Sequence, residues 1–263
     1  MRTTNFSQVL FDSLQYSGND RQNISDDTFA QFRDFCSARL RESWESNQWS
    51  DICRIVPFTT AYDTIVDING DLQKTAYFTP ATESSEILGV FSRNPQSSTK
   101  AVNITYSIYE DNGVRKIIIN NQIATGYYLY RIKCPELVGS VYDSLTVYFN
   151  NSQIYFDSGS GTGTYTPVSG KPHSGNFYTC TANTSTAGHS PSTTPSAWSI
   201  VQIPYVFGSY MAYGATANWL ASELMIQEAA TMEAKAKEVI DLEYDKFLHQ
   251  QGQFGRINMF KTY

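Results

Sequence analysis

The feature that most constrains the fold is a long proline-free segment near the end of the chain. After Pro204, apolar side chains recur every three or four residues, which is the period of an amphipathic helix that ends near Gly252. The positions are Phe207, Tyr210, Met211, Trp219, Leu220, Leu224, Met232, Ala236, Val239, Ile240 and Phe247. This pattern predicts one helix of about 45 residues, which would reach roughly 65 Å at 1.5 Å per residue.

A helix of that length implies assembly. The chain has 263 residues, and a single chain of this size folded as a ball has no interior long enough to cover the whole apolar stripe. We therefore expect part of the stripe to contact neighbouring copies. The predicted interface residues on it are Phe207, Tyr210, Met211, Trp219, Leu220 and Leu224.

A second, shorter helix is predicted near the N-terminus. Residues 1–24 are polar and read as a loosely held arm. Ser25 then has the character of an N-cap, and Asp26 and Asp27 favour the positive end of the helix that follows. Its apolar face consists of Phe29, Phe32, Cys36, Leu40 and Trp44. Trp44 and Trp49, which lies just beyond the helix, are the predicted anchors for packing and assembly.

The middle of the chain has the alternation typical of strands. Asn112-Gly113 separates two strand-like runs, and this dipeptide favours a tight hairpin turn. Residues 157–197 are rich in Gly, Ser and Thr, which suits either a linker or a loop-rich β module. Phe177, Tyr178, Cys180 and Trp198 are spaced as buried anchors, which favours an ordered small module at about 141–202.

We therefore predict an α+β fold. A helical core would be built from the N-terminal helix and the long C-terminal helix, with a large antiparallel β region inserted between them. The predicted boundaries are the arm at 1–24, the helical core at 25–50 and 203–251, the β region at 51–202, and a docking tail at 252–263. The tail carries three apolar residues expected to contact a partner, which are Ile257, Met259 and Phe260.

Composition and charge argue against several functional classes. The formal net charge is −6 and there is no lysine- or arginine-rich run, which argues against a grip on nucleic acid through phosphate contacts. No apolar stretch is long enough for a membrane span, and the N-terminus has no signal-like apolar segment. We expect a soluble chain, made in the cytoplasm, whose four scattered cysteines are reduced.

The sequence contains no pattern typical of catalysis. His173, His189 and His249 have no Cys, His or Asp at ligand spacing. The Gly-rich run at 159–163 lacks the Lys-Ser/Thr of a phosphate loop, and no helix is expected to follow it. Acidic pairs such as Glu83 and Glu86 are typical of solvated surfaces. We predict a protein that is not an enzyme, with no catalytic residue, cofactor or metal.

Two blocks at the ends of the chain carry a more specific likeness. DTFAQFRDFCSARLRESWESNQWSDI, with Arg39, Arg41, Trp44, Glu45 and Trp49, resembles the first helix of tailed-bacteriophage head-to-tail connector (adaptor) proteins. The second block looks like the closing element of those proteins. Its matching positions are Trp198, Ile203-Pro204, Gly214-Ala215, Leu220, Glu223 and Ala229-Ala230.

That resemblance implies a structural protein of the virion neck, made in the host cytoplasm. The family forms dodecameric rings that join the portal to a tail or nozzle protein, and DNA passes through the ring without specific binding. The β region is larger than in minimal adaptors, which suggests attachment of fibre or collar proteins.

A second resemblance covers only the small module. Gly175, Tyr178, Cys180, Gly188-His-Ser-Pro191 and Trp198 are similar to the pattern of small chitin-binding-type modules. This likeness implies a glycan contact at Tyr178, because exposed aromatic rings stack on sugars. The alternative is that Tyr178 and Trp198 belong to the hydrophobic core. A carbohydrate-binding tail or fibre-attachment protein is accordingly the alternative function.

Overall fold

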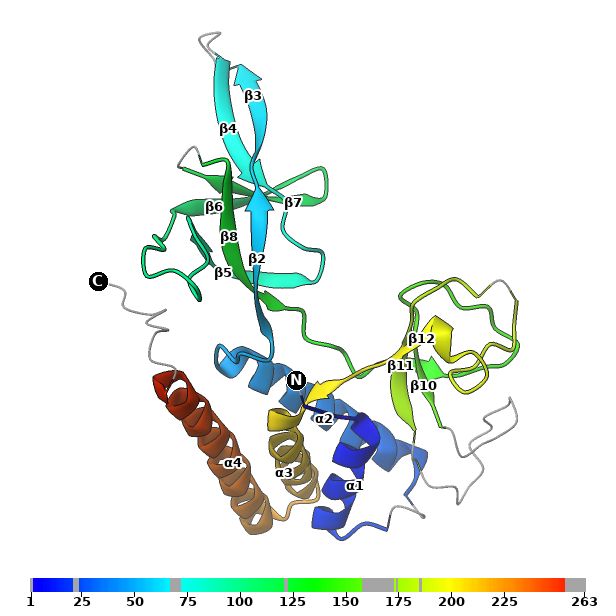
Figure 1. Ribbon diagram of the computed structural model, residues 1–263. Coiled ribbons are helices and arrows are strands. Elements are labelled where there is room, and N and C mark those ends of the chain that lie inside the picture. Colours follow the sequence, from blue (N-terminus) through cyan, green and yellow to red (C-terminus); the bar gives the residue numbers. More distant parts are fainter. Residues whose placement is uncertain are drawn as a thin grey trace. The chain divides into compact units, whose positions relative to one another are not determined.

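The computed structural model describes residues 2–20, 24–66, 72–120, 123–157, 173, 175–184 and 186–253. The chain divides into two compact units, each formed by segments that are distant in sequence. The first unit comprises Met1–Asn47 and Cys134–Asp245, and the second comprises Gln48–Lys133 and Lys246–Tyr263. Figure 1 shows the helices and strands of both units.

The first helix, α1 (Phe6–Ser17), lies within the segment that the sequence led us to treat as a loose arm. The side chain of Asn5 caps it by accepting a hydrogen bond from the backbone N–H of Gln8, and Gly18 ends it with φ of 75°. One face of α1 is buried through Phe6, Val9, Leu10 and Leu14. The prediction of a loosely held arm is therefore wrong, because this short apolar face packs against the rest of the unit.

The second helix, α2 (Asp26–Ser46), agrees with the prediction. The hydroxyl of Ser25 accepts a hydrogen bond from the backbone N–H of Thr28 at 3.1 Å, which is the expected N-cap. The helix buries Phe32, Cys36, Leu40 and Trp44 along one face.

The C-terminal segment forms two helices in place of the single predicted one. These are α3 (Tyr205–Ser222) and α4 (Ile226–Gln253). The N–H of Met225 donates to the carbonyl of Leu220 at 2.9 Å, and the N–H of Leu224 donates to Ala221 at 3.1 Å. This pair of bonds is a Schellman motif, which ends a helix on one residue in the left-handed conformation. Leu224 is that residue, with φ of 63°, where glycine is usual.

The helices α1, α2 and α3 pack together in the first unit (Figure 1). The ring of Phe32 on α2 stacks on Trp219 of α3 with centroids 5.7 Å apart. The hydroxyl of Thr216 on α3 donates to the carbonyl of Ser13 on α1 at 3.0 Å. The small residues Ala212 and Ala215 are fully buried on α3, which lets its neighbours approach closely.

A small sheet belongs to the same unit as these helices. Its strand order is β12 (Trp198–Ile200), β11 (Asn176–Cys180), β10 (Gln153–Phe156) and β9 (Ser140–Val141), and the β9–β10 pair is parallel. Phe177 on β11 packs edge-on against Phe6 of α1 at 5.0 Å. The short 3-10 helix η1 (Pro195–Ala197) precedes β12. Two further strands, β1 (Thr3–Thr4) and β13 (Ile203–Pro204), form a separate antiparallel pair.

The second unit is antiparallel β structure in two sheets. One sheet contains β2 (Cys53–Thr59), β8 (Thr125–Ile132) and β5 (Ser84–Phe91). The other contains β3 (Ala61–Val66), β4 (Leu72–Phe78), β7 (Val114–Ile119) and β6 (Tyr106–Asp111). Phe58 and Phe78, one from each sheet, stack at 4.1 Å in the core of the unit. The predicted hairpin is confirmed, with positive φ at Asn112 and Gly113 between β6 and β7.

The predicted fold class is wrong. The chain is 36% helical and 29% strand, with four helices and four sheets among the described residues. The helices are not a core into which one β region is inserted. The strands divide between the two units, because the aromatic face of the small sheet packs on α1. The sequence pattern located strands, but it did not show which of them share a core with the helices.

Candidate assembly surface

The packing of α2 on α3 joins a sequence block near the N-terminus, residues 27–52, to one in the last third of the chain, residues 196–240. Trp44 of the first block lies with its ring centroid 5.9 Å from that of Phe207 in the second. The Phe32–Trp219 stack forms a second contact between the blocks. The pairing of the first helix with part of the C-terminal helical segment was expected, and it is confirmed by these contacts.

Arg39 is the polar centre of this packing. Its guanidinium donates to the side-chain oxygen of Asn218 on α3 at 2.8 Å, and it forms an ion pair with Glu233 of α4. The same group lies 3.4 Å from the hydroxyl of Tyr210, and burial raises the pKa of that tyrosine to about 12. Only 10% of the Arg39 side chain is exposed, so its charge depends on these partners.

Gly214 makes room for the Arg39 side chain. A Cβ atom added at Gly214 would lie 2.7 Å from Cδ and Nε of Arg39, which is closer than real atoms approach. The glycine of the Gly214-Ala215 pair is therefore a packing requirement, because the arginine stem crosses α3 at this position.

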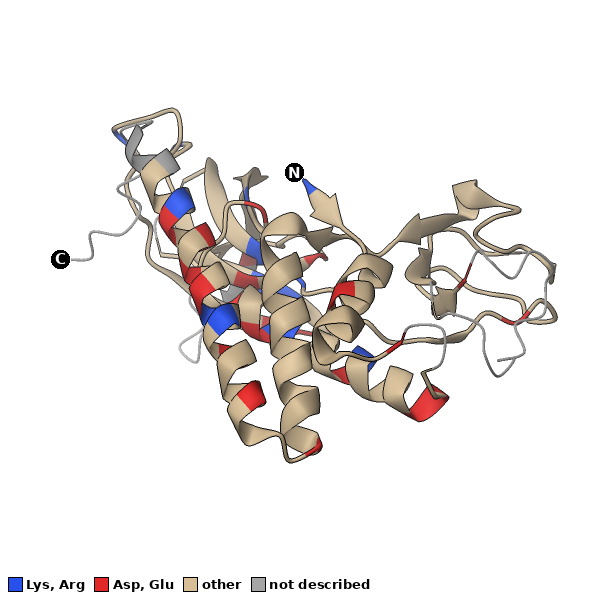
Figure 2. Cartoon of the chain, turned by 90° about the horizontal axis from the view of Figure 1, so that it is seen from below, with Lys and Arg blue, Asp and Glu red and all other residues tan. Residues whose placement is uncertain are grey.

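The helix α4 uses only one face against the first unit. Ala229 and Ala236 are buried, and Glu233, between them on the same face, reaches Arg39. Lys235 lies with its ammonium 6.0 Å from the ring centroid of Tyr213 on α3. Figure 2 shows red and blue bands along α4, which mark its acidic and basic residues, and Glu228, Lys237 and Glu238 among them are exposed. Small residues and an ion pair thus contribute to the packing of α4, together with the half-buried Met232, Val239 and Ile240.

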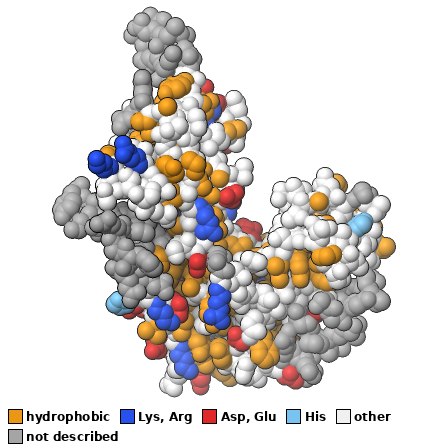
Figure 3. All heavy atoms as spheres, viewed as in Figure 1, with side chains coloured by type: hydrophobic (Ala, Val, Ile, Leu, Met, Phe, Trp, Pro, Cys, Tyr) orange, Lys and Arg blue, Asp and Glu red, His pale blue; other side chains and the backbone are white. Residues whose placement is uncertain are grey.

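The corner between α3 and α4 exposes three consecutive apolar residues. Leu224 is 83% exposed, Met225 48% and Ile226 63%. The acidic residues Glu223 and Glu228 flank them and are also exposed. We define the acidic corner as Glu223, Leu224, Met225, Ile226 and Glu228. Figure 3 shows apolar side chains reaching the lower surface of the molecule over the helices.

The opposite end of α3 carries an exposed aromatic ring with a cation above it. The guanidinium carbon of Arg2 lies 3.8 Å from the ring centroid of Tyr205, which is 47% exposed. The backbone holds this pair in place, because the N–H of Tyr205 donates to the carbonyl of Arg2 at 3.0 Å. We define the basic end as Arg2 and Tyr205.

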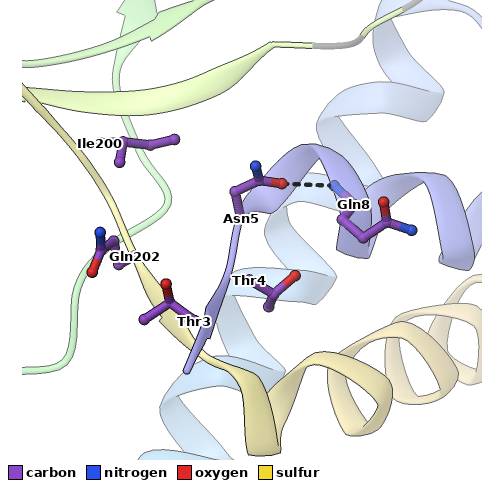
Figure 4. A pocket seen from close by; sticks show the side chains of 6 residues that line it. All are labelled: Thr3, Thr4, Asn5, Gln8, Ile200 and Gln202. Atoms are coloured by element: carbon purple, nitrogen blue, oxygen red, sulfur yellow. Dashed lines mark hydrogen bonds between the residues drawn. The ribbon is translucent and has the colours of Figure 1, made fainter. Parts of the chain in front are cut away.

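A shallow pocket of about 340 Å³ lies next to the basic end. Figure 4 shows the lining side chains and the hydrogen bond between Asn5 and Gln8. The lining residues are Thr3, Thr4, Asn5, Gln8, Ile200 and Gln202. None of these six side chains is ionisable, so the pocket offers hydrogen bonds but no acid–base group.

The structure places most of the predicted interface residues inside the chain itself. Those buried in the first unit are Trp44, Phe207, Tyr210, Met211 and Leu220. Trp219 is half-buried against Phe32, and Trp49 is buried in the second unit near Phe247, at 6.3 Å. Leu224 is the predicted interface residue that is strongly exposed. Ile257, Met259 and Phe260 of the predicted docking tail lie outside the described residues.

Met225 and Ile226 were missed from the sequence. Their signal was the apolar run at 224–226, which departs from the three-and-four spacing of a helix face. Arg2 and Tyr205 had no sequence signal as a pair, because they are far apart in the chain.

The small sheet shows where Tyr178 and Trp198, the two aromatic residues considered for a glycan contact or the core, are placed. Trp198 is buried, and its indole N–H donates to the carbonyl of His189 at 3.0 Å. Tyr178 is half-buried and edge-on to Phe156 at 6.1 Å, and burial raises the pKa of its hydroxyl. Trp198 is therefore a core residue, while a glycan contact at Tyr178 stays a prediction.

The titratable groups of the described residues do not gather into a metal site. No group of three or more His, Cys, Asp and Glu side chains that could hold an ion occurs in this part of the chain. His173 is buried and stacks on Phe29 at 4.3 Å, and burial lowers its pKa although Asp26 and Asp157 act in the opposite direction. All four cysteines are free. None of the described helices combines the length and apolar character that a membrane span requires.

Comparison with known proteins identifies no relative. The chain matches no protein-family model, and no curated protein matches it in sequence.

Proposed function

We propose that this protein is a structural component of a tailed-phage neck. It would assemble as a ring adaptor between the portal and the tail or nozzle, and let DNA pass through the ring. The proposal is based on geometry and packing, with no chemical step.

The α2–α3 contact is the observation that carries the proposal. The two sequence blocks that resemble connector proteins are separated by most of the β region, and they pack directly against each other through Phe32, Trp219 and the Trp44–Phe207 pair. This contact supports the proposal because it places both blocks in one helical unit.

The charge of the chain suits a passage for DNA. A formal net charge of −6 discourages adhesion of the DNA backbone to the ring, because like charges repel. Exposed apolar surface at the acidic corner supplies the means of joining protein neighbours.

Electron microscopy of the purified full chain, alone and mixed with the portal ring of the same virion, tests the proposal. We expect a ring that seats on the portal and has an open central channel. A chain that never joins the portal at any protein or salt concentration would contradict the proposal. Binding to an array of glycans in place of the portal would favour the alternative of a carbohydrate-binding tail protein.

The predicted docking tail has a separate test. Removing residues 253–263 should abolish joining to one neighbour in the neck while the rest of the chain stays folded. Unchanged joining by the truncated chain would remove the tail from the proposal without affecting the ring itself.

A further inference from the structure

Leu224 occupies a position where its own fold favours a different residue. It is the left-handed residue of the Schellman motif that ends α3, with φ of 63°, and a side chain in this conformation is strained. Its side chain is 83% exposed, so it adds little to the core of the chain. Glycine would suit the backbone better. The fold of the single chain therefore does not account for a leucine at this position.

The surroundings of Leu224 have the composition of a contact site. Met225 and Ile226 extend the apolar surface, and they are 48% and 63% exposed. Glu223 and Glu228 flank this surface with negative charge. An apolar centre with a charged rim selects a partner whose own apolar centre has a rim of opposite sign.

The basic end at the other terminus of α3 has this complementary character. Tyr205 offers an exposed ring, and Arg2 carries a positive charge directly above it. The helix dipole adds to these charges. The N-terminus of α3 at Tyr205 is its positive end, where Arg2 lies, and the C-terminus at Ser222 is its negative end, where Glu223 lies. The two ends of one helix are thus matched to each other, but one chain cannot bring them together.

We infer that the acidic corner of one copy docks on the basic end of a second copy of this chain. Leu224, Met225 and Ile226 would cover the Tyr205 ring, and Glu223 or Glu228 would pair with Arg2. The contact joins two different patches, so each copy can bind one neighbour at each end of α3. Such a head-to-tail contact closes into a ring when the rotation between copies allows it. This inference rests on the self-association in the proposed function, and it specifies the surfaces that make it.

The test uses two variants of the full chain with matched defects. The first is Leu224→Gly with Glu223→Arg, which damages the acidic corner and leaves the basic end intact. The second is Arg2→Glu with Tyr205→Ser, which damages the basic end and leaves the corner intact. The tag is placed at the C-terminus, at the other end of the chain from Arg2. Masses are measured by native mass spectrometry and sedimentation.

We expect the wild type to form multimers and each variant alone to be monomeric. An equal mixture of the two variants should give a heterodimer and nothing larger, because the mixture contains one intact pair of surfaces. The single change Leu224→Gly should weaken self-association by about ten-fold or more, the usual effect of truncating a central contact residue. Leu242→Ser, on an exposed part of α4, is the control and should leave the masses unchanged.

Two results would overturn the inference. One is a wild-type multimer that survives in both variants, and the other is a mixture of the variants that stays monomeric. Electron microscopy with the portal separates the two proposals. If each variant still forms a ring on the portal, the proposed contact is wrong and the proposed neck function is unaffected. If the masses follow the expected pattern in the mixing test but the protein never binds the portal, the neck function is wrong and the proposed contact is supported.

Discussion

The helices α3 and α4 come from one continuous apolar pattern, yet the chain uses them in opposite ways. The sequence of α3 has no charged residue, and its buried positions lie on several sides because α1 and α2 both pack on it. The part of α4 in the first unit buries Ala229 and Ala236 and exposes charged residues elsewhere. The comparison teaches that periodicity identifies a helix and one apolar stripe, while the number of neighbours decides how much of the surface is buried.

The largest expected effect follows from the burial of α3. Phe207 is fully buried and packs against Trp44, so Phe207→Ala should lower the free energy of unfolding by about 3–5 kcal/mol. Urea denaturation measures this change. The matched change on α4, Leu242→Ala, should stay within about 0.5 kcal/mol of the wild type because Leu242 is exposed. Equal effects at both positions would refute the contrast between the two helices.

The ion pair between α4 and the other helices gives a smaller effect. Glu233→Gln removes one of the two carboxylates that pair with Arg39, the other being Glu42, and should lower the free energy of unfolding by about 1–3 kcal/mol. Hydrogen exchange of α4 amides should rise more than that of α3 amides, because α3 keeps its apolar contacts. Glu238→Gln is the control, since Glu238 is exposed on the same helix. Similar exchange in both variants would show that the pair does not hold α4.

Gly214 tests how closely α2 and α3 approach. Gly214→Ala favours the helix by about 1 kcal/mol, but the added Cβ would meet the Arg39 stem at 2.7 Å. Overpacking of this kind costs about 1–3 kcal/mol, so a net loss of stability is expected. If denaturation showed a gain, the close approach of Arg39 to α3 would be in doubt. Arg39→Ala removes the side chain that the added Cβ would meet. The double variant Gly214→Ala with Arg39→Ala should therefore be more stable than Arg39→Ala alone, because alanine favours the helix.

The smallest effect concerns the corner that separates the two helices. Leu224→Gly should raise the free energy of unfolding by about 1 kcal/mol, because glycine adopts positive φ without strain. Thermal denaturation under conditions that keep the chain monomeric measures it. A loss of stability would mean that the leucine side chain supports the fold of its own chain.

Some elements could be predicted from the sequence because their signals are local. The Ser25 cap and the spacing of Phe32, Cys36 and Leu40 predicted α2, and Asn112-Gly113 predicted the hairpin between β6 and β7. The α1 helix had comparable signals in the Asn5 cap and the Gly18 stop, but its apolar face is short and lies in a polar segment. The break at Leu224 had no Gly, Pro or Asn to mark it, so one helix was predicted where two exist.

Only part of the candidate assembly surface could be predicted from the sequence. Leu224 was predicted as an interface residue and is exposed, whereas Phe207, Met211 and Leu220 were predicted with it and are buried in their own chain. All four share one apolar period, and period alone does not separate a core contact from a contact between copies. Arg2 and Tyr205 come together only through the pairing of β1 with β13.

The sequence by itself determined the helix α2, the helical character of the segment after Pro204, the turn at Asn112-Gly113, and the acidic balance of the chain. These depend on neighbouring residues and on composition, which a single sequence contains in full. The tertiary structure alone decided that α1 and α2 cover α3, that the small sheet shares a unit with the helices, and that Leu224 faces solvent in a strained conformation. Those outcomes depend on contacts between segments far apart in the chain, where the competition for buried area selects one partner among many.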